Sequence, residues 1–540
     1  MDIFLKDAIS TNKHKVTLEK TRKEGLIRPG LIIALGTFIS RIFGLARELV
    51  LANFFGTSFY ADVINTGLKF PNLFRRIFGE GALSAAFVPI YSAGLTKDKT
   101  HACKFLSQVF FLLLLALIII TIILELLMPQ VVLITTPGFF ADSIKYELAI
   151  LTCRITTPYL IFICLAALLG GALSAHRKFG AFAFAPIILN ICVIICCLLG
   201  DSDYSKTIFV SFGICVGGII QLAFLLIASK NIISLSFFGR GRVIQEVFIF
   251  LKNMFPALVS NGSGQINIFF SHIMASFIPS AISILSYAER IYQFPLALIG
   301  ICLGTILLPE LSKLYAKKET TRAVELQYNI IIFGLILSVG TMAGLISLAH
   351  PLIHVIYERG AFVIDDTAKT SVTISIFALG LPAYVLVKIL TPIFYAKLDT
   401  KTPMKVSLMT IAINCTLNVL FVFCGIGYIG IALGTSLAAW ANVFMLYFFC
   451  RKLKIKITGK SILRDVILIL LCSGIMSIIL LIMSLQLKSL IYSSHLIIKC
   501  MVLLFLILIG SILFLSSCFL SGVNFLKNLQ FRYYNKFQKN

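Results

Sequence analysis

Apolar and polar positions follow one another in long blocks along this chain rather than in short periodic patterns. Runs of roughly twenty mostly apolar residues recur over its whole length, separated by short polar stretches. A helix of about twenty residues spans the hydrocarbon core of a bilayer. The pattern therefore predicts an all-α polytopic membrane protein with fourteen transmembrane helices, beginning near residues 29, 60, 104, 147, 183, 207, 246, 281, 325, 367, 405, 429, 464 and 496.

The overall composition agrees with a membrane protein. Of the 540 residues, 59% are hydrophobic and 13% are charged, which is too much apolar surface for a soluble core. The first 25 residues are polar and basic, so we expect no cleavable signal peptide and the first span to direct insertion. The fourteen Cys lie mostly inside apolar runs, where they pack as small hydrophobes, so no redox function is predicted.

The distribution of positive charge predicts the topology. The net charge is +24, and most Lys and Arg fall in the two tails and in one alternating set of loops. Cytoplasmic loops of membrane proteins carry this excess, so we expect both termini in the cytoplasm, which requires an even number of spans. The membrane surface accounts for the basic charge, and no nucleic-acid partner is predicted.

An internal repeat divides the predicted spans into two sets. At an offset of about 220 residues, Pro89 aligns with Pro309, and Gly213 through Gln221 aligns with Gly434 through Asn442. A unit of six spans gives parallel repeats, as in many transporters. We therefore expect two pseudo-symmetric six-helix lobes with a central cavity between them, followed by two extra C-terminal helices: residues 1–230, 231–452 and 453–540.

The first two predicted spans carry an unusual number of charges. A charged side chain at the centre of a bilayer costs roughly 2.5–3.5 kcal/mol, so these residues are expected to face a wet or protein-lined interior. They are Arg41, Arg47, Glu48, Asp62, Lys69, Arg75, Arg76 and Glu80.

Four of the arginines suggest an anion site. Guanidinium groups bind phosphate oxygens in a bidentate manner, and Arg290 in the eighth span adds a cation from the second lobe to Arg41, Arg47 and Arg75. We expect these four to bind a phosphate-bearing substrate. Arg76 and Glu80 fit a structural ion pair equally well, and we expect a supporting or gating role for Glu48, Asp62, Arg76, Glu80 and Gln293.

Two further groups of residues raise the question of a bound cation. His350, His354 and Glu358 have the spacing of zinc ligands on one helix face, but Pro351 interrupts them, and no metal site is predicted. Asn414, Asn418 and Thr435 offer oxygen ligands to Na⁺. Because they include no carboxylate, helix–helix hydrogen bonding is the favoured interpretation of these side chains.

Signatures of catalysis are missing from the sequence. It contains no Walker loop, no zinc protease or deaminase motif and no nucleophile elbow, so neither an enzyme nor a cofactor is predicted. Without a nucleotide site in this chain, the driving force for transport would be an ion gradient or the membrane potential.

Several long segments resemble the MurJ (MviN) lipid II flippases. The run TFISRIFGLARELVLANFFGTSFYADVINTGLKFPNLFRRIFGEGALSAAFVPIYS carries most of the resemblance, and TTPGF, AFAPIILN, YAERIYQFP, GTILLPELS, ERGAF and DTKTPMKV extend it. The resemblance implies the fold of the multidrug/oligosaccharidyl-lipid/polysaccharide exporter superfamily. It also implies a bacterial inner-membrane protein that moves an undecaprenyl-diphosphate-linked disaccharide-pentapeptide, lipid II, from the cytoplasmic to the periplasmic leaflet by alternating access, for peptidoglycan biosynthesis.

The resemblance also assigns roles to individual residues. It implies that Arg41, Arg47, Arg75 and Arg290 are important in the cavity, as is Asp62, and that the extra helices form a groove for the polyprenyl tail. Gln293 stands where some members have a glutamate. Lipid II, membrane lipids and cell-wall synthesis enzymes are the implied partners.

Two other functions are compatible with the sequence pattern. An exporter of another polyprenyl-diphosphate-linked oligosaccharide, such as an O-antigen unit, would need the same cationic cavity. A membrane scaffold for cell-wall enzymes would need no transport at all. A cationic drug is a poorer substrate for a basic cavity.

Overall fold

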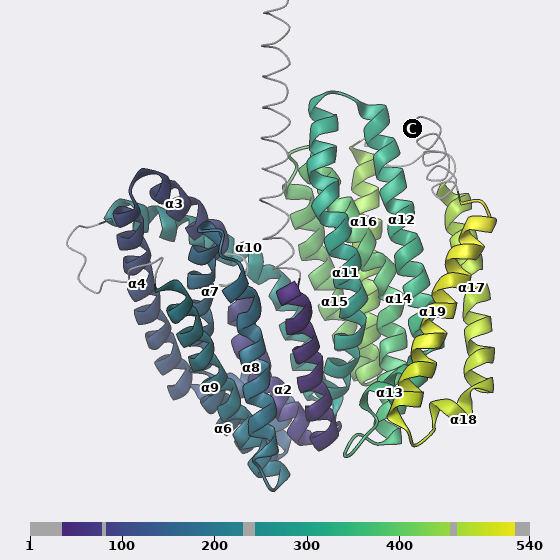
Figure 1. The fold of residues 1–540 in the computed structure, drawn as a ribbon, viewed down its shortest axis with the longest axis horizontal. Coiled ribbons are helices and arrows are strands. Elements are labelled where there is room, and N and C mark those ends of the chain that lie inside the picture. Colours follow the sequence, from purple (N-terminus) through teal and green to yellow (C-terminus); the bar gives the residue numbers. More distant parts are fainter. Residues whose placement is uncertain (1–34, 78–82, 231–242, 454–461, 524–540) are drawn as a thin grey trace, which may run out of the picture. The chain divides into compact units, whose positions relative to one another are not determined.

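The computed structural model describes residues 35–77, 83–230, 243–453 and 462–523, and the regular secondary structure of these residues is helical (Figure 1). The chain divides into two compact units. Unit 1 comprises residues up to 51 together with 63–134 and 140–265, whereas unit 2 comprises 52–62, 135–139 and the chain from 266 onward. The boundary thus falls twice within the first two helical segments, since residues 52–62 belong to unit 2.

Unit 1 is built from closely packed helices around α7 and α9. Its described elements are the helical residues 35–51, most of α2 (Phe59–Phe74), α3 (Leu83–Lys97), α4 (Lys99–Leu126), α5 (Met128–Thr135), α6 (Ser143–Thr156), α7 (Tyr159–Ala175), α8 (Gly180–Leu198), α9 (Asp203–Ser229) and the first part of α10 (Ile244–Ser276). Small residues allow α9 to approach its neighbours. A Cβ at Gly218 would lie 2.4 Å from the ring of Tyr159 on α7, and one at Gly217 would lie 3.0 Å from Leu189 on α8. Close backbone approach of this kind is typical of membrane helices.

Unit 2 has a long helical core. Its described helices are the rest of α10, then α11 (Ala281–Ala316), α12 (Thr320–Ser347), α13 (Ala349–Tyr357), α14 (Ile364–Tyr395), α15 (Lys401–Phe423), α16 (Tyr428–Lys452), α17 (Ile462–Gln486), α18 (Lys488–Ile491) and α19 (Leu496–Leu520). Leu307 of α11, Ile332 of α12 and Ile389 of α14 are fully buried at the centre. A glycine again brings two helices together, because a Cβ at Gly380 of α14 would lie 2.9 Å from Ser436 of α16.

The last helices form one edge of unit 2. Helices α17 and α19 pack against each other, α17 packs on α12, and α19 packs on α13 (Figure 1). A polar contact fixes this edge at one point: the hydroxyl of Tyr328 on α12 donates to the carboxylate of Asp465, in the first turn of α17 and fully buried. A buried carboxylate needs such a partner, because an unpaired one is strongly destabilising.

Ten of the described helical stretches are long and apolar enough to cross a membrane, counting α6 and α7 as one. Their exposed faces are also apolar, as Leu115, Ile119 and Ile122 of α4 illustrate, which is the pattern of a helix surrounded by lipid. The prediction of an all-helical, multi-pass membrane protein is thereby confirmed. The four other predicted spans, near residues 29, 60, 246 and 281, fall on residues 35–55, α2, α10 and α11, all helical where described. The count of fourteen and the two predicted lobes stay predictions.

Candidate functional site

A tight turn at residues 55–58 joins the first helical segment, residues 35–55, to α2. Other parts of unit 2 hold this turn by hydrogen bonds to its backbone carbonyls. Gly56 has φ +53°, a conformation that disfavours residues with a Cβ. The N–H of Ala361 donates to the carbonyl of Asn53 at 2.8 Å, and the hydroxyl of Tyr287 donates to the carbonyl of Gly56 at 3.0 Å. A Cβ atom added at Gly56 would lie 2.3 Å from the carbonyl oxygen of Ala361, and one added at Gly360 would lie 2.3 Å from that of Asn53. The two segments therefore approach each other at backbone contact distance.

Asp62 is fully buried and caps a helix that is distant in sequence. Its Oδ1 accepts a hydrogen bond from the N–H of Ser283 at 2.9 Å, in the first turn of α11. The N-cap residue of α11, Ser280, has φ +60° and makes no capping bond of its own. Asp62 thus supplies the negative charge and the acceptor that this helix terminus lacks. Thr57 makes a comparable contact, since its hydroxyl donates to Asp366 at the start of α14.

Arg47 and Glu48, on the first helical segment, are both buried in unit 1. Arg47 is 8% exposed and Glu48 is 3% exposed, and Nη2 of Arg47 lies 2.7 Å from Oε1 of Glu48. The Nε atom of Arg47 is buried without a hydrogen-bond partner among the described residues. A guanidinium carries five N–H donors, and Nε of Arg47 adds no bond to the contact that Nη2 makes with Glu48, so the side chain retains capacity for a second anion.

Arg75 lies at the end of α2, after the predicted kink. Pro71 stands inside this helix and cannot donate to the carbonyl one turn earlier. The side chain of Asn72 compensates locally, because its Nδ2 donates to the carbonyl of Leu68 and its Oδ1 accepts from Nε of Arg75 at 3.2 Å. Arg75 and Arg47 both lie close enough to the buried Tyr159 of α7 for their charges to act on its hydroxyl. Unit 1 therefore brings these two predicted site residues into one neighbourhood.

The other predicted charges of the first two spans have different surroundings. Arg41 is exposed, whereas Lys69 and Arg76 are half-buried. Glu80 lies outside the described residues, so the ion pair predicted for Arg76 and Glu80 stays a prediction.

Arg290 lies on α11 in unit 2 and is exposed. Phe294 and Leu298, one and two turns later, are 52% and 65% exposed, so Arg290 begins an open face of this helix. Gln293, the neutral residue at a position where we expected a supporting role, donates from Nε2 to Oε1 of Glu289 at 2.7 Å. A carboxylate, that of Glu289, thus lies one turn before Gln293 on the same helix.

Asn414 and Asn418 of unit 2 are buried, and their polar atoms are hydrogen-bonded to different degrees. Asn418 donates from Nδ2 to the hydroxyl of Ser271 on α10 at 3.0 Å, and Thr435 donates to the carbonyl of Ile431 within its own helix. The Oδ1 atoms of Asn414 and Asn418 are buried without a hydrogen-bond partner in the described part of the chain. The contact of Asn418 with Ser271 is of the helix–helix type.

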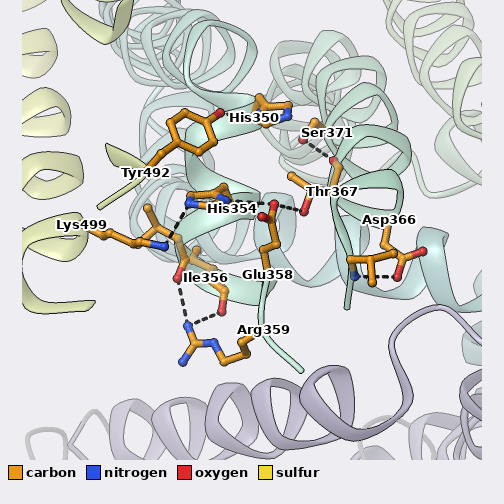
Figure 2. Close-up of polar contacts among 12 residues, drawn as sticks. His350, His354, Ile356, Glu358, Arg359, Asp366, Thr367, Ser371, Tyr492 and Lys499 are labelled. Atoms are coloured by element: carbon orange, nitrogen blue, oxygen red, sulfur yellow. Dashed lines mark hydrogen bonds and ion pairs between the residues drawn. The ribbon is translucent and has the colours of Figure 1, made fainter. Parts of the chain in front are cut away.

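Of the three residues with zinc-like spacing, His354 and Glu358 contact each other, whereas His350 contacts Tyr492. Figure 2 shows His350 beside Tyr492, and His354 between Glu358 and Lys499. Among the described residues, no group of three or more His, Cys, Asp or Glu is arranged to hold a metal ion. The regular spacing of these three side chains on one helix face therefore does not produce a metal site in the described part of the chain.

Comparison with known proteins connects these residues to a family. The family model described as "Lipid II flippase MurJ" matches residues 51–501. A protein of Rickettsia prowazekii (strain Madrid E) named "Probable lipid II flippase MurJ" is 46% identical over 501 residues, which are 92% of this chain and 98% of that protein.

The chain belongs to the MurJ family.

Solved structures agree with this assignment. A structure titled "Lipid II flippase MurJ, inward closed conformation" superposes with a TM-score of 0.76 at 29% identity, covering 92% of this chain and 99% of the other. An inward-facing multidrug transporter of the MATE family and MOP superfamily has a TM-score of 0.65 at 13% identity, covering 79% and 99% of the two chains. This second likeness shows the fold alone. The resemblance to MurJ flippases is thus confirmed over most of the chain.

Several contact residues were not singled out by sequence reasoning. Ser283, Tyr287 and Tyr159 are ordinary polar or aromatic residues in apolar helices, and Gly56 is one of 36 glycines. Tyr287 does stand in the family-like run YAERIYQFP, and Gly56 stands in the long run that begins TFISRIFG. Their partners lie far away in sequence, so no local pattern identifies them.

Proposed function

We propose that this protein is a lipid II flippase of the bacterial inner membrane. It moves the undecaprenyl-diphosphate-linked disaccharide-pentapeptide from the cytoplasmic to the periplasmic leaflet for peptidoglycan synthesis. The observation that carries the proposal is the match of the MurJ family model to residues 51–501, with 46% identity to a relative over nearly the full length of both chains. It is a transporter rather than an enzyme.

The proposal includes fourteen spans with both termini in the cytoplasm. Within the described residues, ten helical stretches meet the length and hydropathy of a span, and the remaining four would be residues 35–55, α2, α10 and α11. Residues 35–55 and α2 carry charged residues within their length, which is expected if they line a polar interior rather than contact lipid: Arg41, Arg47, Glu48, Asp62 and Lys69. The concentration of Lys and Arg in alternate loops supports the orientation.

Arg41, Arg47, Arg75 and Arg290 are the proposed ligands of the substrate diphosphate. Burial of Arg47 with an unused Nε donor, and its shared neighbourhood with Arg75 around Tyr159, support the proposal within unit 1. Glu48 would hold Arg47 in orientation, since one of its oxygens lies 2.7 Å away. An arginine that is already oriented loses less conformational freedom on binding phosphate.

Asp62 is the proposed gating residue. Its bond to the first turn of α11, together with the contacts of the neighbouring turn, fastens residues 52–62 to the rest of unit 2. Alternating access requires contacts of this kind to form in one state and break in the other. Asn414, Asn418 and Thr435 stay the candidates for a monovalent cation.

The membrane potential supplies enough free energy for export. Moving one charge across 100 mV is worth roughly 2.3 kcal/mol. A diphosphate with two negative charges therefore gains about 4–5 kcal/mol when it moves outward across an inside-negative membrane. No nucleotide hydrolysis is needed for this direction of transport.

Replacement of Arg47 tests the transport model. We expect Arg47→Ala to abolish appearance of the precursor on the outer leaflet, measured in cells that depend on this protein, and Arg47→Lys to restore little activity because the bidentate contact is lost. Arg451→Ala is the matched control, since Arg451 is an exposed arginine at the end of α16, and it should transport normally. Unchanged flipping by Arg47→Ala at normal protein levels would contradict the proposal and favour a scaffold.

Native mass spectrometry of the purified protein distinguishes the cargoes. A co-purifying lipid with the mass of lipid II supports the proposal. A polyprenyl diphosphate carrying another oligosaccharide would instead identify an exporter of the O-antigen type.

A further inference from the structure

A cluster of polar residues joins α13 to α18 and α19 within unit 2 (Figure 2). His354 lies at its centre and is 6% exposed. Its Nε2 lies 3.2 Å from Nζ of Lys499 on α19, and its Nδ1 lies 2.9 Å from Oε2 of Glu358 at the end of α13. One imidazole ring thus connects a cation on one helix with a carboxylate on another.

The chemistry of the two partners fixes the protonation of His354. A lysine ammonium has three donors and no acceptor, so Nε2 of His354 must accept and carries no proton. The single ring proton then resides on Nδ1, facing Glu358. This pattern of donors and acceptors is that of an imidazole with one ring proton, placed between an ammonium and a carboxylate.

Glu358 is suited to remain the anionic end of this chain of contacts. Burial opposes its ionisation, but hydrogen bonds from Thr367 and His354 more than compensate and leave the pKa of Glu358 below its ordinary value. The Thr367 hydroxyl, from α14, lies 2.6 Å from the same Oε2 atom. The carboxylate is thus held from two helices.

Other groups around His354 are engaged elsewhere. The ring of Tyr492 packs against the imidazole with ring centroids 4.4 Å apart, while its hydroxyl lies 2.8 Å from Nδ1 of His350. Arg359 donates to the carbonyls of Val355 and Ile356 at the end of α13. On α14, Asp366 accepts from the N–H of Val363 and from Thr57, and Asp365 pairs with Lys369.

We propose that His354 is a proton-responsive site that fastens α19 to α13 when neutral and releases it when protonated. Protonation places an N–H on Nε2, which can then no longer accept a hydrogen bond from Lys499. The imidazolium and the ammonium of Lys499 then face each other as two positively charged donors. Two like charges about 3 Å apart repel each other, and the ammonium of Lys499 must move away. Glu358 still balances the imidazolium, so α13 keeps its local structure while the attachment of α18 and α19 weakens.

The contact between α17 and α12 would be unaffected by protonation of His354. Asp465 and Tyr328 hold α17 to α12 without a histidine or lysine. The loop charges predict that the His354 cluster faces the periplasm, where it would sense the external pH. The inference concerns only residues of unit 2 and does not depend on the identity of the cargo.

Hydrogen–deuterium exchange of the full-length protein in lipid nanodiscs tests this site. Measurements at pH about 8 and about 5.5 bracket the range in which an imidazole ordinarily takes up a proton. After correction for the intrinsic pH dependence of exchange, we expect peptides covering α18 and the first turns of α19 to exchange several-fold faster at the lower pH. Peptides of α17 should show no such change.

Matched variants separate His354 from its neighbours. His354→Gln and Lys499→Met should each abolish the pH response, whereas His350→Gln and Lys488→Met should retain it. Lys499→Met leaves the buried imidazole in place, so it decides the question even if His354→Gln does not fold. An unchanged response in Lys499→Met, or a wild-type protein without any response, would overturn the proposal.

Discussion

Two attachments within unit 2 differ in the chemistry that holds them. The turn between the first helical segment and α2 offers two backbone carbonyls as acceptors, that of Asn53 to the N–H of Ala361 and that of Gly56 to the hydroxyl of Tyr287. The edge formed by α18 and α19 is fixed instead by the side chains of His354 and Lys499. Backbone amides keep their donor and acceptor roles at any physiological pH, whereas an imidazole changes role with one proton.

The difference shows how one fold can contain both a rigid and a responsive contact. Backbone contacts require the two chain segments to approach closely, and only glycine allows this at Gly56 and Gly360. Side-chain contacts leave room for movement. The turn should therefore be sensitive to added volume, and the α13–α19 contact to charge.

Gly56→Ala should have the largest effect on stability. The new Cβ would lie 2.3 Å from the carbonyl oxygen of Ala361, and the backbone has φ +53°. Left-handed strain of about 1–2 kcal/mol and the loss of one or two backbone hydrogen bonds should together destabilise the protein by about 3 kcal/mol. Thermal unfolding in nanodiscs measures this.

Gly425→Ala separates strain from close approach. Gly425 also has a positive φ of +78°, but nothing lies within 4 Å of its added Cβ. Only the conformational part, about 1–2 kcal/mol, should remain. Equal losses for the two variants would show that the backbone contact at the turn contributes nothing.

Asp62→Ala should have an intermediate effect. It removes the acceptor for the N–H of Ser283 and the charge at the start of α11, which should destabilise the protein by about 1.5–3 kcal/mol. Asp62→Asn keeps an oxygen acceptor and should recover part of the loss. Chemical unfolding followed by circular dichroism measures each variant.

Asp98→Ala is the comparison for Asp62→Ala. Asp98 caps α4 at the exposed surface, where its Oδ1 accepts from the N–H of Thr100. Its removal should be milder, because water replaces the lost acceptor. A larger loss at Asp98 than at Asp62 would contradict the capping role of the buried carboxylate.

Lys369→Met should have the smallest effect. Lys369 pairs with Asp365 one turn away on α14, and both side chains are well exposed, 40% and 67%. An exposed pair of this spacing contributes less than about 0.5 kcal/mol, and salt screens it. A loss comparable with that of Asp62→Ala, or one that is independent of salt, would show that charge at the surface of α14 matters more than burial.

The sequence predicted much of the fold but little of the contact network. Hydrophobic runs located the membrane helices because lipid requires about twenty apolar residues in a row. The charges of the first two spans pointed to a polar interior, and the structure does bury Arg47, Glu48 and Asp62. The spacing of His350, His354 and Glu358 raised the question of a metal site, but it did not reveal Tyr492 and Lys499, which contact His350 and His354 from more than 130 residues away.

The sequence by itself determined which segments are apolar enough to lie in the membrane, and to which family the chain belongs. Hydropathy depends only on the composition of one helix, and the long MurJ-like runs can be identified directly in the sequence. Tertiary structure decided what each polar side chain contacts: that Asp62 caps α11, that Arg47 is buried with a donor to spare, and that His354 lies beside Lys499. These roles depend on donors and acceptors brought together from distant parts of the chain, and only the folded arrangement pairs them.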